Sequence, residues 1–163
     1  LGREWQTGTI QLDFQQPIRF ELFYTDKDGS RKAPVVVHRV IYGSLERFIG
    51  ILTEHTAGAF PLWLAPVQIK VIPIGDEHHK EASNVHDMLE KAGIRSELAL
   101  DDSGFGKKVR AAKVEKIPYF IVIGDKDIEA KKVTLESRDK GNLGQLSATE
   151  VLEKLQKEIT DKK

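Results

Sequence analysis

The sequence predicts an α/β fold in two parts, with antiparallel strands and one helix over residues 1–64 and an α/β domain over residues 65–163. Two patterns predict this division. Polar and apolar residues alternate in the first part, as in half-buried strands, whereas strand-like and helix-like runs follow one another in the second. Residues 58–66 lie between them and combine glycine and proline with large apolar side chains, which indicates a packed junction.

The first part contains three runs with strand character. Residues 9–14 alternate between polar and apolar, residues 20–25 are rich in aromatic side chains, and residues 35–41 are mostly β-branched. Turn residues at 26–29 precede the third run, so we expect a three-strand meander. One helix would leave much of the aromatic surface uncovered, and the chain starts without methionine. We therefore expect further polypeptide on the N-terminal side.

A helix is predicted directly after the third strand. Gly43 and Ser44 turn the chain, and Ser44 is placed to cap the helix. Arg47 falls opposite an apolar stripe on the helical wheel, on the face that it shares with Gly50. A guanidinium group beside a glycine and away from the core suits an anionic ligand. The stripe is formed by Leu45, Phe48, Ile49 and Leu52.

The second part predicts a mixed, mostly parallel sheet with three helices. Strand, helix, strand, helix and strand patterns occupy residues 67–74, 76–92, 94–100, 105–116 and 119–123 in turn. This alternation favours parallel pairing through right-handed crossovers. Residues 124–127 then reverse the chain into an antiparallel strand at 131–135. Ser147 and Glu150 form a capping box for the last helix.

The composition is that of a globular protein without a charge bias. Of the 163 residues, 40% are hydrophobic, and 25 basic side chains balance 25 acidic ones. Any RNA contact must therefore use local patches. The chain has no cysteine, which excludes disulfides and thiolate zinc sites and fits a reducing compartment. No apolar run approaches the roughly 20 residues of a membrane span, and no signal peptide is evident, so we expect a cytoplasmic protein.

Residues 35–66, with the strand, the Gly43–Ser44 turn and Arg47, resemble the third signature motif of class II aminoacyl-tRNA synthetases. Among these enzymes the chain resembles the threonyl-tRNA synthetases most closely. The resemblance extends upstream through residues 2–14 and downstream to the C-terminus. It implies that residues 1–64 are the end of a catalytic domain and that residues 65–163 are an anticodon-binding domain.

The resemblance also implies an activity. The intact enzyme would be a homodimeric threonine–tRNA ligase, which activates threonine with ATP and magnesium and transfers it to tRNA(Thr). Because the earlier signature motifs lie outside this chain, we expect the chain alone to be catalytically incomplete. Two alternatives stay open: a stand-alone tRNA- or RNA-binding module without catalytic activity, and a regulatory paralogue in which neither site works.

Four residues match the ATP and threonine pocket of this family, namely Gln6, Gln11, Ser44 and Arg47. Arg47 matches the catalytic arginine that contacts ATP phosphate, which is consistent with electrostatic stabilisation of the transferred group. A glutamine amide both donates and accepts hydrogen bonds, as an adenine edge or an amino acid requires. Without the resemblance, Gln11 is more simply the polar face of a half-buried strand.

His38 lies in the middle of the β-branched strand, where a core histidine with satisfied hydrogen bonds is the ordinary interpretation. The resemblance implies instead that His38 is one of three zinc ligands. Its two partners lie outside this chain, and zinc needs about four ligands. We therefore expect no zinc at His38 in the isolated chain. A second metal site at His78, His79 and His86 is less favoured than a solvated helix start.

The resemblance places anticodon-binding residues at Asp102, Lys107, Lys108, Asp127, Glu136 and Arg138. The chain departs from the family where Asp101 to Gly106 replace the usual Arg-Asn-Glu-Lys-Ile-Gly, and where Glu136 replaces an arginine. Arg138 is a candidate to replace that arginine. Lys107, Arg110, Lys113 and Lys116 form a basic stripe at helical spacing, which is either a solvated face or an RNA phosphate contact.

Overall fold

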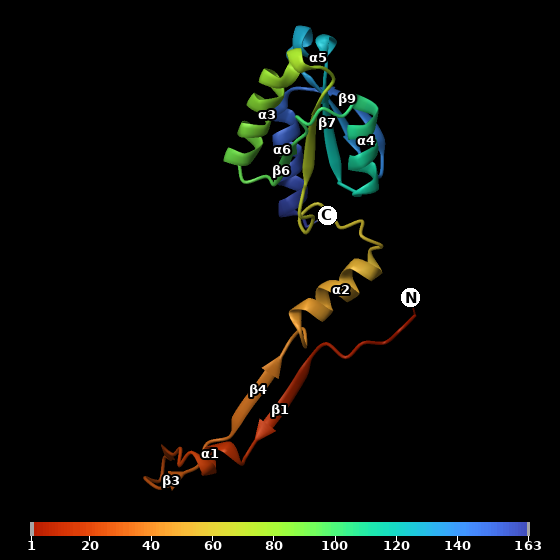
Figure 1. The fold of residues 1–163 in the computed structure, drawn as a ribbon. Coiled ribbons are helices and arrows are strands. Elements are labelled where there is room, and N and C mark those ends of the chain that lie inside the picture. The colour runs from red at the N-terminus through yellow and green to blue at the C-terminus, as the bar shows by residue number, and fades with distance from the viewer. Residues whose placement is uncertain (1, 163) are drawn as a thin grey trace. The chain divides into compact units, whose positions relative to one another are not determined.

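The structure is a computed structural model that describes residues 2–162 (Figure 1). Its contacts divide the chain into two compact units, Leu1–His55 and Thr56–Lys163, here called unit 1 and unit 2. The domain boundary predicted after residue 64 stays a prediction. None of the helices in the described range is long and apolar enough to span a membrane.

Unit 1 is built on one antiparallel strand pair. β1 (Thr9–Asp13) pairs with β4 (Val36–Val40), while β2 (Tyr24–Thr25) and β3 (Arg31–Lys32) form a separate short hairpin between them. The predicted three-strand meander is therefore wrong. A short helix, α1 (Gln16–Arg19), carries Pro17 in its first turn, and Asp13 Oδ1 accepts the backbone N–H groups of Gln15 and Gln16 at 2.8 and 2.9 Å. These contacts turn the chain away before the aromatic run can pair with β1.

α2 (Leu45–His55) follows β4, and its predicted cap is confirmed. The backbone N–H of Arg47 donates to Ser44 Oγ at 3.2 Å. None of the residues of α2, all within the described range, is buried. Ile10, Leu12 and Val37 on one face of the β1–β4 pair are also more than half exposed. The aromatic surface that the sequence predicts to be uncovered is exposed as well, since Phe14, Phe20 and Phe23 are each more than half exposed.

Unit 2 contains a five-stranded mixed sheet in the order β6-β5-β7-β8-β9. β6 (Ser96–Leu98), β5 (Ile69–Pro73) and β7 (Tyr119–Ile123) are parallel, and β8 (Val133–Ser137) and β9 (Gly141–Leu146) add antiparallel pairs. A 3₁₀ turn, η1 (Asp76–His78), leads into the first helix. The helices are α3 (His79–Lys91), α4 (Phe105–Val114), α5 (Asp125–Ala130) and α6 (Ala148–Thr160).

Two apolar clusters form the core of unit 2. The larger one packs Leu89 of α3 and Leu155 of α6 against Ile121 and Leu135 of the sheet. The smaller one packs Ala112 of α4 and its neighbours against the opposite sheet face, which includes Ile72 and Phe120. α3 and α4 accordingly cover opposite faces in Figure 1. Unit 2 is therefore a three-layered domain, and the predicted α/β class is confirmed.

Two elements of unit 2 were not predicted from the sequence. α5 has only six residues and follows Gly124 directly, where a simple turn is expected. β9 contains Gly141 and Gly144, both with positive φ, and a register shift lies opposite it between Leu135 and Glu136. Glycines and a bulge erase the two-residue periodicity of a strand. The sheet is mixed as predicted, but its antiparallel part is larger.

Candidate functional site

The polar face of the β1–β4 pair brings two predicted site residues together. Gln11 and His38 are register partners, so their side chains lie on the same face. With Asp13 they line an open hollow of about 770 Å³. His38 is exposed, not buried as the core interpretation requires, and its imidazole is open to a ligand on this face.

Asp13 is the charged neighbour of His38. Its Oδ2 lies 3.3 Å from His38 Nε2, and its other oxygen accepts the two backbone N–H groups at the start of α1. The N–H groups of Gln16 and Gln15, together with His38, lower the pKa of Asp13 from its usual value. An ionised Asp13 can fix the imidazole of His38 by accepting its N–H.

Arg47 lies exposed at the start of α2, against the Gly43–Ser44 turn. Its Nη2 donates to the backbone oxygen of Gln6 at 3.3 Å. A Cβ added at Gly43 would lie 2.6 Å from that same nitrogen, and Gly43 has a φ of +72°. The positive φ of the turn favours glycine at position 43, and a side chain there would displace the Arg47 guanidinium group from its present position. Gln6 contributes its main-chain carbonyl to this arrangement.

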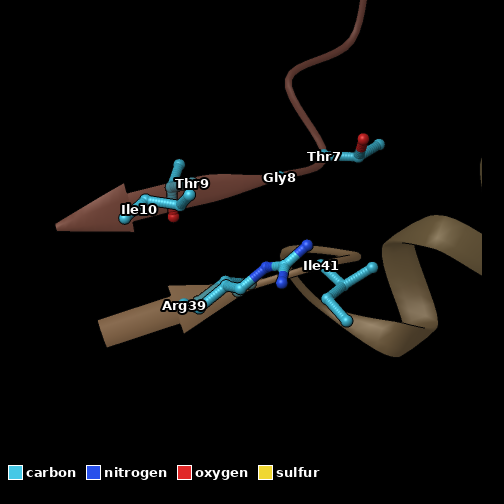
Figure 2. A pocket seen from close by; sticks show the side chains of 7 residues that line it. Thr7, Gly8, Thr9, Ile10, Arg39 and Ile41 are labelled. Carbon is cyan, nitrogen blue, oxygen red and sulfur yellow. The ribbon is translucent and has the colours of Figure 1, made fainter. Parts of the chain in front are cut away.

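A second hollow of about 290 Å³ lies where β1 and β4 approach the turn into α2 (Figure 2). Thr7, Gly8 and Arg39 line it with neighbouring residues. Sequence reasoning missed Arg39, although the signal is present. Arg39 follows His38 in the strand, so the two-residue periodicity places it on the opposite face from the predicted zinc ligand.

Asp127 is buried at the start of α5 and joins three parts of unit 2. Its Oδ2 accepts the N–H of Gly124 at 3.1 Å, and its Oδ1 accepts the hydroxyl of Thr134 at 2.7 Å and the amide of Gln145 at 2.9 Å. Asp127 is only 5% exposed. Both carboxylate oxygens are engaged within the protein, so this structure gives Asp127 a structural role beside its predicted RNA contact.

Glu136 lies on the face of β8 that α4 partly covers, opposite Phe120 of β7. Lys113 Nζ of α4 is 3.9 Å from Glu136 Oε2 and 5.7 Å from the centre of the Phe120 ring. This exposed lysine offsets the negative charge of Glu136 on that face. Among the other predicted contacts, Lys107 and Asp102 are exposed, whereas Lys108 is only 8% exposed.

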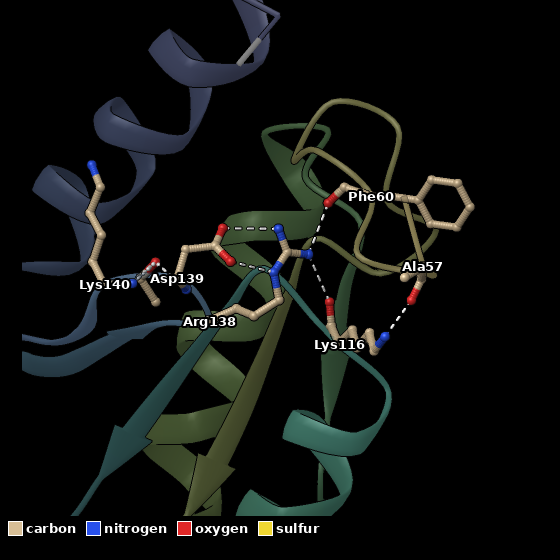
Figure 3. Close-up of polar contacts among 7 residues, drawn as sticks. Ala57, Phe60, Lys116, Arg138, Asp139 and Lys140 are labelled. Atoms are coloured by element: carbon tan, nitrogen blue, oxygen red, sulfur yellow. Dashed lines mark hydrogen bonds and ion pairs between the residues drawn. The ribbon is translucent and has the colours of Figure 1, made fainter. Parts of the chain in front are cut away.

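Arg138 follows β8 and donates in three directions (Figure 3). Nη1 donates to the backbone oxygens of Phe60 and Lys116 at 3.0 Å each, while Nε and Nη2 each bind one oxygen of Asp139 at 2.9 Å. The paired Arg138 lowers the pKa of Asp139 from its usual value. The sequence offers Arg138 as a substitute for the family arginine that Glu136 replaces. To contact RNA in that role, Arg138 would have to break these contacts with protein groups.

His78 differs from the predicted solvated helix start, because it is only 1% exposed. Its Nδ1 accepts the N–H of Gly75 at 3.0 Å, and Nε2 lies 3.0 Å from Asp125 Oδ1. With Glu77 and Asp125 it forms a cluster of three possible metal ligands. The contact with Gly75 occupies one ring nitrogen, so the histidine serves here to join the ends of β5 and β7.

Comparison with known proteins identifies both units. Residues 68–158 match the family described as the anticodon binding domain. The chain belongs to the anticodon-binding domain family. Residues 1–56 match the tRNA synthetase class II core domain (G, H, P, S and T). The predicted combination of the end of a class II core with an anticodon-binding domain is confirmed.

Over nearly its whole length, this chain is about half identical to the aligned quarter of its curated relatives. The threonine–tRNA ligase of Caldanaerobacter subterraneus subsp. tengcongensis is 53% identical over 99% of the chain and 25% of its own length. That of Desulforamulus reducens is 51% identical over 99% of the chain and 26% of its own length. The chain thus spans about a quarter of these relatives, and the predicted resemblance to threonyl-tRNA synthetases is confirmed.

A solved structure supports the fold of the anticodon-binding domain and of the segment before it. The RNA binding domain of threonyl-tRNA synthetase from Cryptosporidium parvum Iowa II superposes with a TM-score of 0.84 and 37% identity. The match covers 95% of this chain and 40% of the Cryptosporidium parvum chain. The fold class predicted from sequence is confirmed by this match.

Proposed function

We propose that this chain is part of a threonine–tRNA ligase, an enzyme of the cytoplasm that joins threonine to tRNA(Thr) at the expense of ATP. The observation that carries the proposal is the 53% identity to such a ligase, which runs through both units over 99% of the chain. Unit 1 would supply part of the substrate site, and unit 2 would bind the anticodon. Homodimerisation and magnesium-bound ATP belong to the same proposal.

In unit 1, Arg47 would contact the ATP phosphates, since its guanidinium group is exposed beside Gly43. Gln11 and Ser44, with the backbone of Gln6, would line the ATP and threonine pocket. Charge that develops on the transferred phosphate is stabilised by a preorganised cation. The supporting geometry is that a hydrogen bond to the backbone oxygen of Gln6 holds the Arg47 guanidinium group in place.

His38 would supply one nitrogen ligand to zinc in the intact ligase. The residues of unit 1 fit a zinc ion only in part. The exposed imidazole of His38 is a suitable nitrogen ligand, but the three-ligand cluster found within residues 2–162 lies elsewhere, around His78. The remaining ligands would be supplied by other parts of the intact ligase. When bound, the metal would recognise the hydroxyl and amine of threonine, and Asp13 would orient the imidazole.

In unit 2, the exposed part of the basic stripe on α4 would contact RNA phosphates beside Glu136. Asp102 and Glu136 carry negative charge at positions where the family has donors, so base recognition would differ in detail from that of other members. Asp127, Lys108 and Arg138 would act from inside the unit, because all three are buried or engaged by protein groups.

Two measurements test the proposal. The chain is titrated with tRNA(Thr) transcripts and with transcripts that carry an unrelated anticodon, at two salt concentrations. We expect at least tenfold tighter binding of tRNA(Thr). We also expect no ATP–pyrophosphate exchange by residues 1–163 alone, and clear exchange once the rest of a class II core is supplied.

The alternative is a stand-alone RNA-binding module, which Asp102 and Glu136 favour because they remove donors from the predicted anticodon surface. Equal affinity for all transcripts would support this alternative and count against the ligase. Loss of RNA binding altogether would contradict both.

A further inference from the structure

Residues 57–65, here called the junction segment, are docked on unit 2 by side chains that bind their backbone oxygens. Lys116 donates to the oxygen of Ala57, Arg138 to that of Phe60, and Gln68 to that of Leu62. Arg95 donates to the oxygens of Trp63 and Ala65. Leu62 is only 2% exposed and belongs to the larger core cluster. The segment is therefore part of the folded unit, although it contains no strand or α-helix.

Arg138 also contacts the two elements that are proposed to bind RNA, β8 and the end of α4. It follows β8, two residues beyond Glu136, and its own N–H donates to the oxygen of Pro118 at 2.8 Å. Nη1 reaches the oxygen of Lys116 just beyond α4, the helix that carries Lys107, Arg110 and Lys113. One guanidinium group thus joins β8, the end of α4 and the junction segment (Figure 3).

The planar shape of the guanidinium group makes this arrangement specific. Asp139 binds Nε and Nη2 at 2.9 Å each, which fixes the plane and aims Nη1 at the two carbonyl oxygens. The Arg138 side chain is only 18% exposed. A lysine offers a point charge without a fork, so it cannot hold Asp139 in two places and two carbonyls together.

We propose that Arg138 is a positioning residue. It couples β8 and α4, the elements that bind RNA in the proposed function, to the junction segment at the N-terminal end of unit 2. RNA that restrains β8 or α4 restrains the guanidinium group, and with it Phe60. By linkage, a fixed junction segment in turn favours RNA binding. The coupling rests on the proposed function, since it needs RNA as the ligand, whereas the docking of the segment does not.

Hydrogen exchange measured by mass spectrometry tests both parts. The amide of Ala59 is a suitable probe, because it bonds to the oxygen of Thr56 inside the docked segment. Without RNA, we expect Arg138→Gln to accelerate exchange in residues 57–62 at least tenfold, and Arg138→Lys and Asp139→Asn to do so less. Arg95→Gln is the matched control, because it removes donors from Trp63 and Ala65 and should affect residues 63–66 instead.

The coupling is tested with the anticodon stem–loop of tRNA(Thr). In the unsubstituted chain, we expect RNA to slow exchange of the Ala59 amide at least fivefold. In Arg138→Gln this response should disappear while peptides from β7 keep their protection, which shows that the unit is still folded. A purely structural role would accelerate exchange but leave the response to RNA intact.

The possible outcomes test the docking role, the coupling and the proposed function separately. Unchanged exchange in Arg138→Gln would overturn the docking role, and an equal response to RNA in both proteins would overturn the coupling. If the unsubstituted chain binds no RNA, the proposed function fails and the coupling with it. The RNA-free comparison would still decide whether Arg138 holds the junction segment.

Discussion

Asp127 shows how a single side chain gains its role from its surroundings. The carboxylate accepts from a backbone N–H, a hydroxyl and an amide, and these belong to three successive elements of unit 2. Loss of the carboxylate would leave the N–H of the buried Gly124 without a partner, whereas Thr134 is half-buried and Gln145 is exposed. A buried unsatisfied group costs more than an ordinary hydrogen bond contributes. The residue that the sequence marks as a ligand contact is thus also a support for α5, β8 and β9.

Replacement of Asp127 by asparagine should destabilise the chain. The amide presents a donor where the carboxylate faces donors, so we expect the free energy of unfolding to fall by about 1–3 kcal/mol. Urea denaturation followed by circular dichroism measures this loss. Glu129→Gln on the same helix is the control, because Glu129 is exposed. A loss no greater than that of the control would show that the three contacts do not stabilise the unit.

Arg47 tests the proposed chemistry in an intact ligase. We expect Arg47→Ala to lower kcat for ATP–pyrophosphate exchange by about 10²-fold or more, since a preorganised cation at the transferred phosphate is lost. Arg47→Lys should recover only part of this activity. The KM for tRNA should stay unchanged. Arg19→Ala, an exposed arginine in α1, serves as the control, and equal activity of the two alanine variants would remove Arg47 from the site.

At the scale of elements, short capping contacts decide where helices begin. Ser147 Oγ accepts the N–H of Glu150 at 3.2 Å, and Glu150 Oε2 accepts the N–H of Ser147 at 2.7 Å. This predicted capping box is confirmed, and it begins the helix that places Val151 and Leu155 in the core. β8 and β9 show the opposite case, because their pairing depends on glycine conformations and a bulge.

Ser147→Ala should lower the free energy of unfolding by about 1 kcal/mol through loss of the cap. The pH dependence should change as well. The N–H and hydroxyl of Ser147 lower the pKa of Glu150 from its usual value of 4.5. The stability that this carboxylate adds is therefore present above pH 4.5 and is lost as the pH falls through the lower folded pKa. Thermal unfolding between pH 3 and 7 should show a shallower acid slope for Ser147→Ala, and parallel curves would contradict this assignment.

At the scale of the whole molecule, the two units differ in how well they bury their own apolar surface. Unit 2 has two core clusters, one on each face of its sheet. Unit 1 leaves Ile10, Leu12 and Val37 more than half exposed on one face of its strand pair. An isolated strand pair is marginally stable in water, and an exposed apolar patch of this kind typically marks a contact with another protein surface.

Separate expression of the two units should reveal this difference. We expect residues 56–163 to unfold in one cooperative thermal transition and to remain monomeric. Residues 1–55 should show no such transition, or should associate through the exposed strands. Circular dichroism and light scattering after size-exclusion chromatography measure both properties. A cooperative, monomeric unit 1 would show that its own contacts are sufficient.

Much of the fold was predictable because its signals are local. The capped helices and the β-branched strands appear in the sequence as periodic runs with stop signals, and the structure places them within a few residues of the predicted bounds. The meander failed because a proline and an aspartate turned the chain at α1. α5 and β9 failed because six residues, or a strand with two glycines, give too weak a periodicity.

The candidate site was predictable only in part. The alternation along β1 and β4 places Gln11 and His38 on one polar face once the two strands are known to pair. Helical spacing predicts that Arg47 lies away from the apolar stripe of α2, and the structure has both Arg47 and the stripe residues Leu45 and Ile49 exposed. Residue type alone could not reveal that Lys108 and Asp127 are buried, since charged residues are mostly exposed.

The sequence by itself determined the class of the fold, the caps of α2 and α6 and the family to which the chain belongs, because each depends on short-range patterns. Tertiary structure alone decided which charged side chains are free to bind a ligand. Arg138 meets Phe60 across 78 positions of sequence, and Asp127 meets Gln145 across 18. Such partners become neighbours only after the sheet has formed, and their hydrogen bonds then hold a charge inside the unit that the sequence alone would assign to the surface.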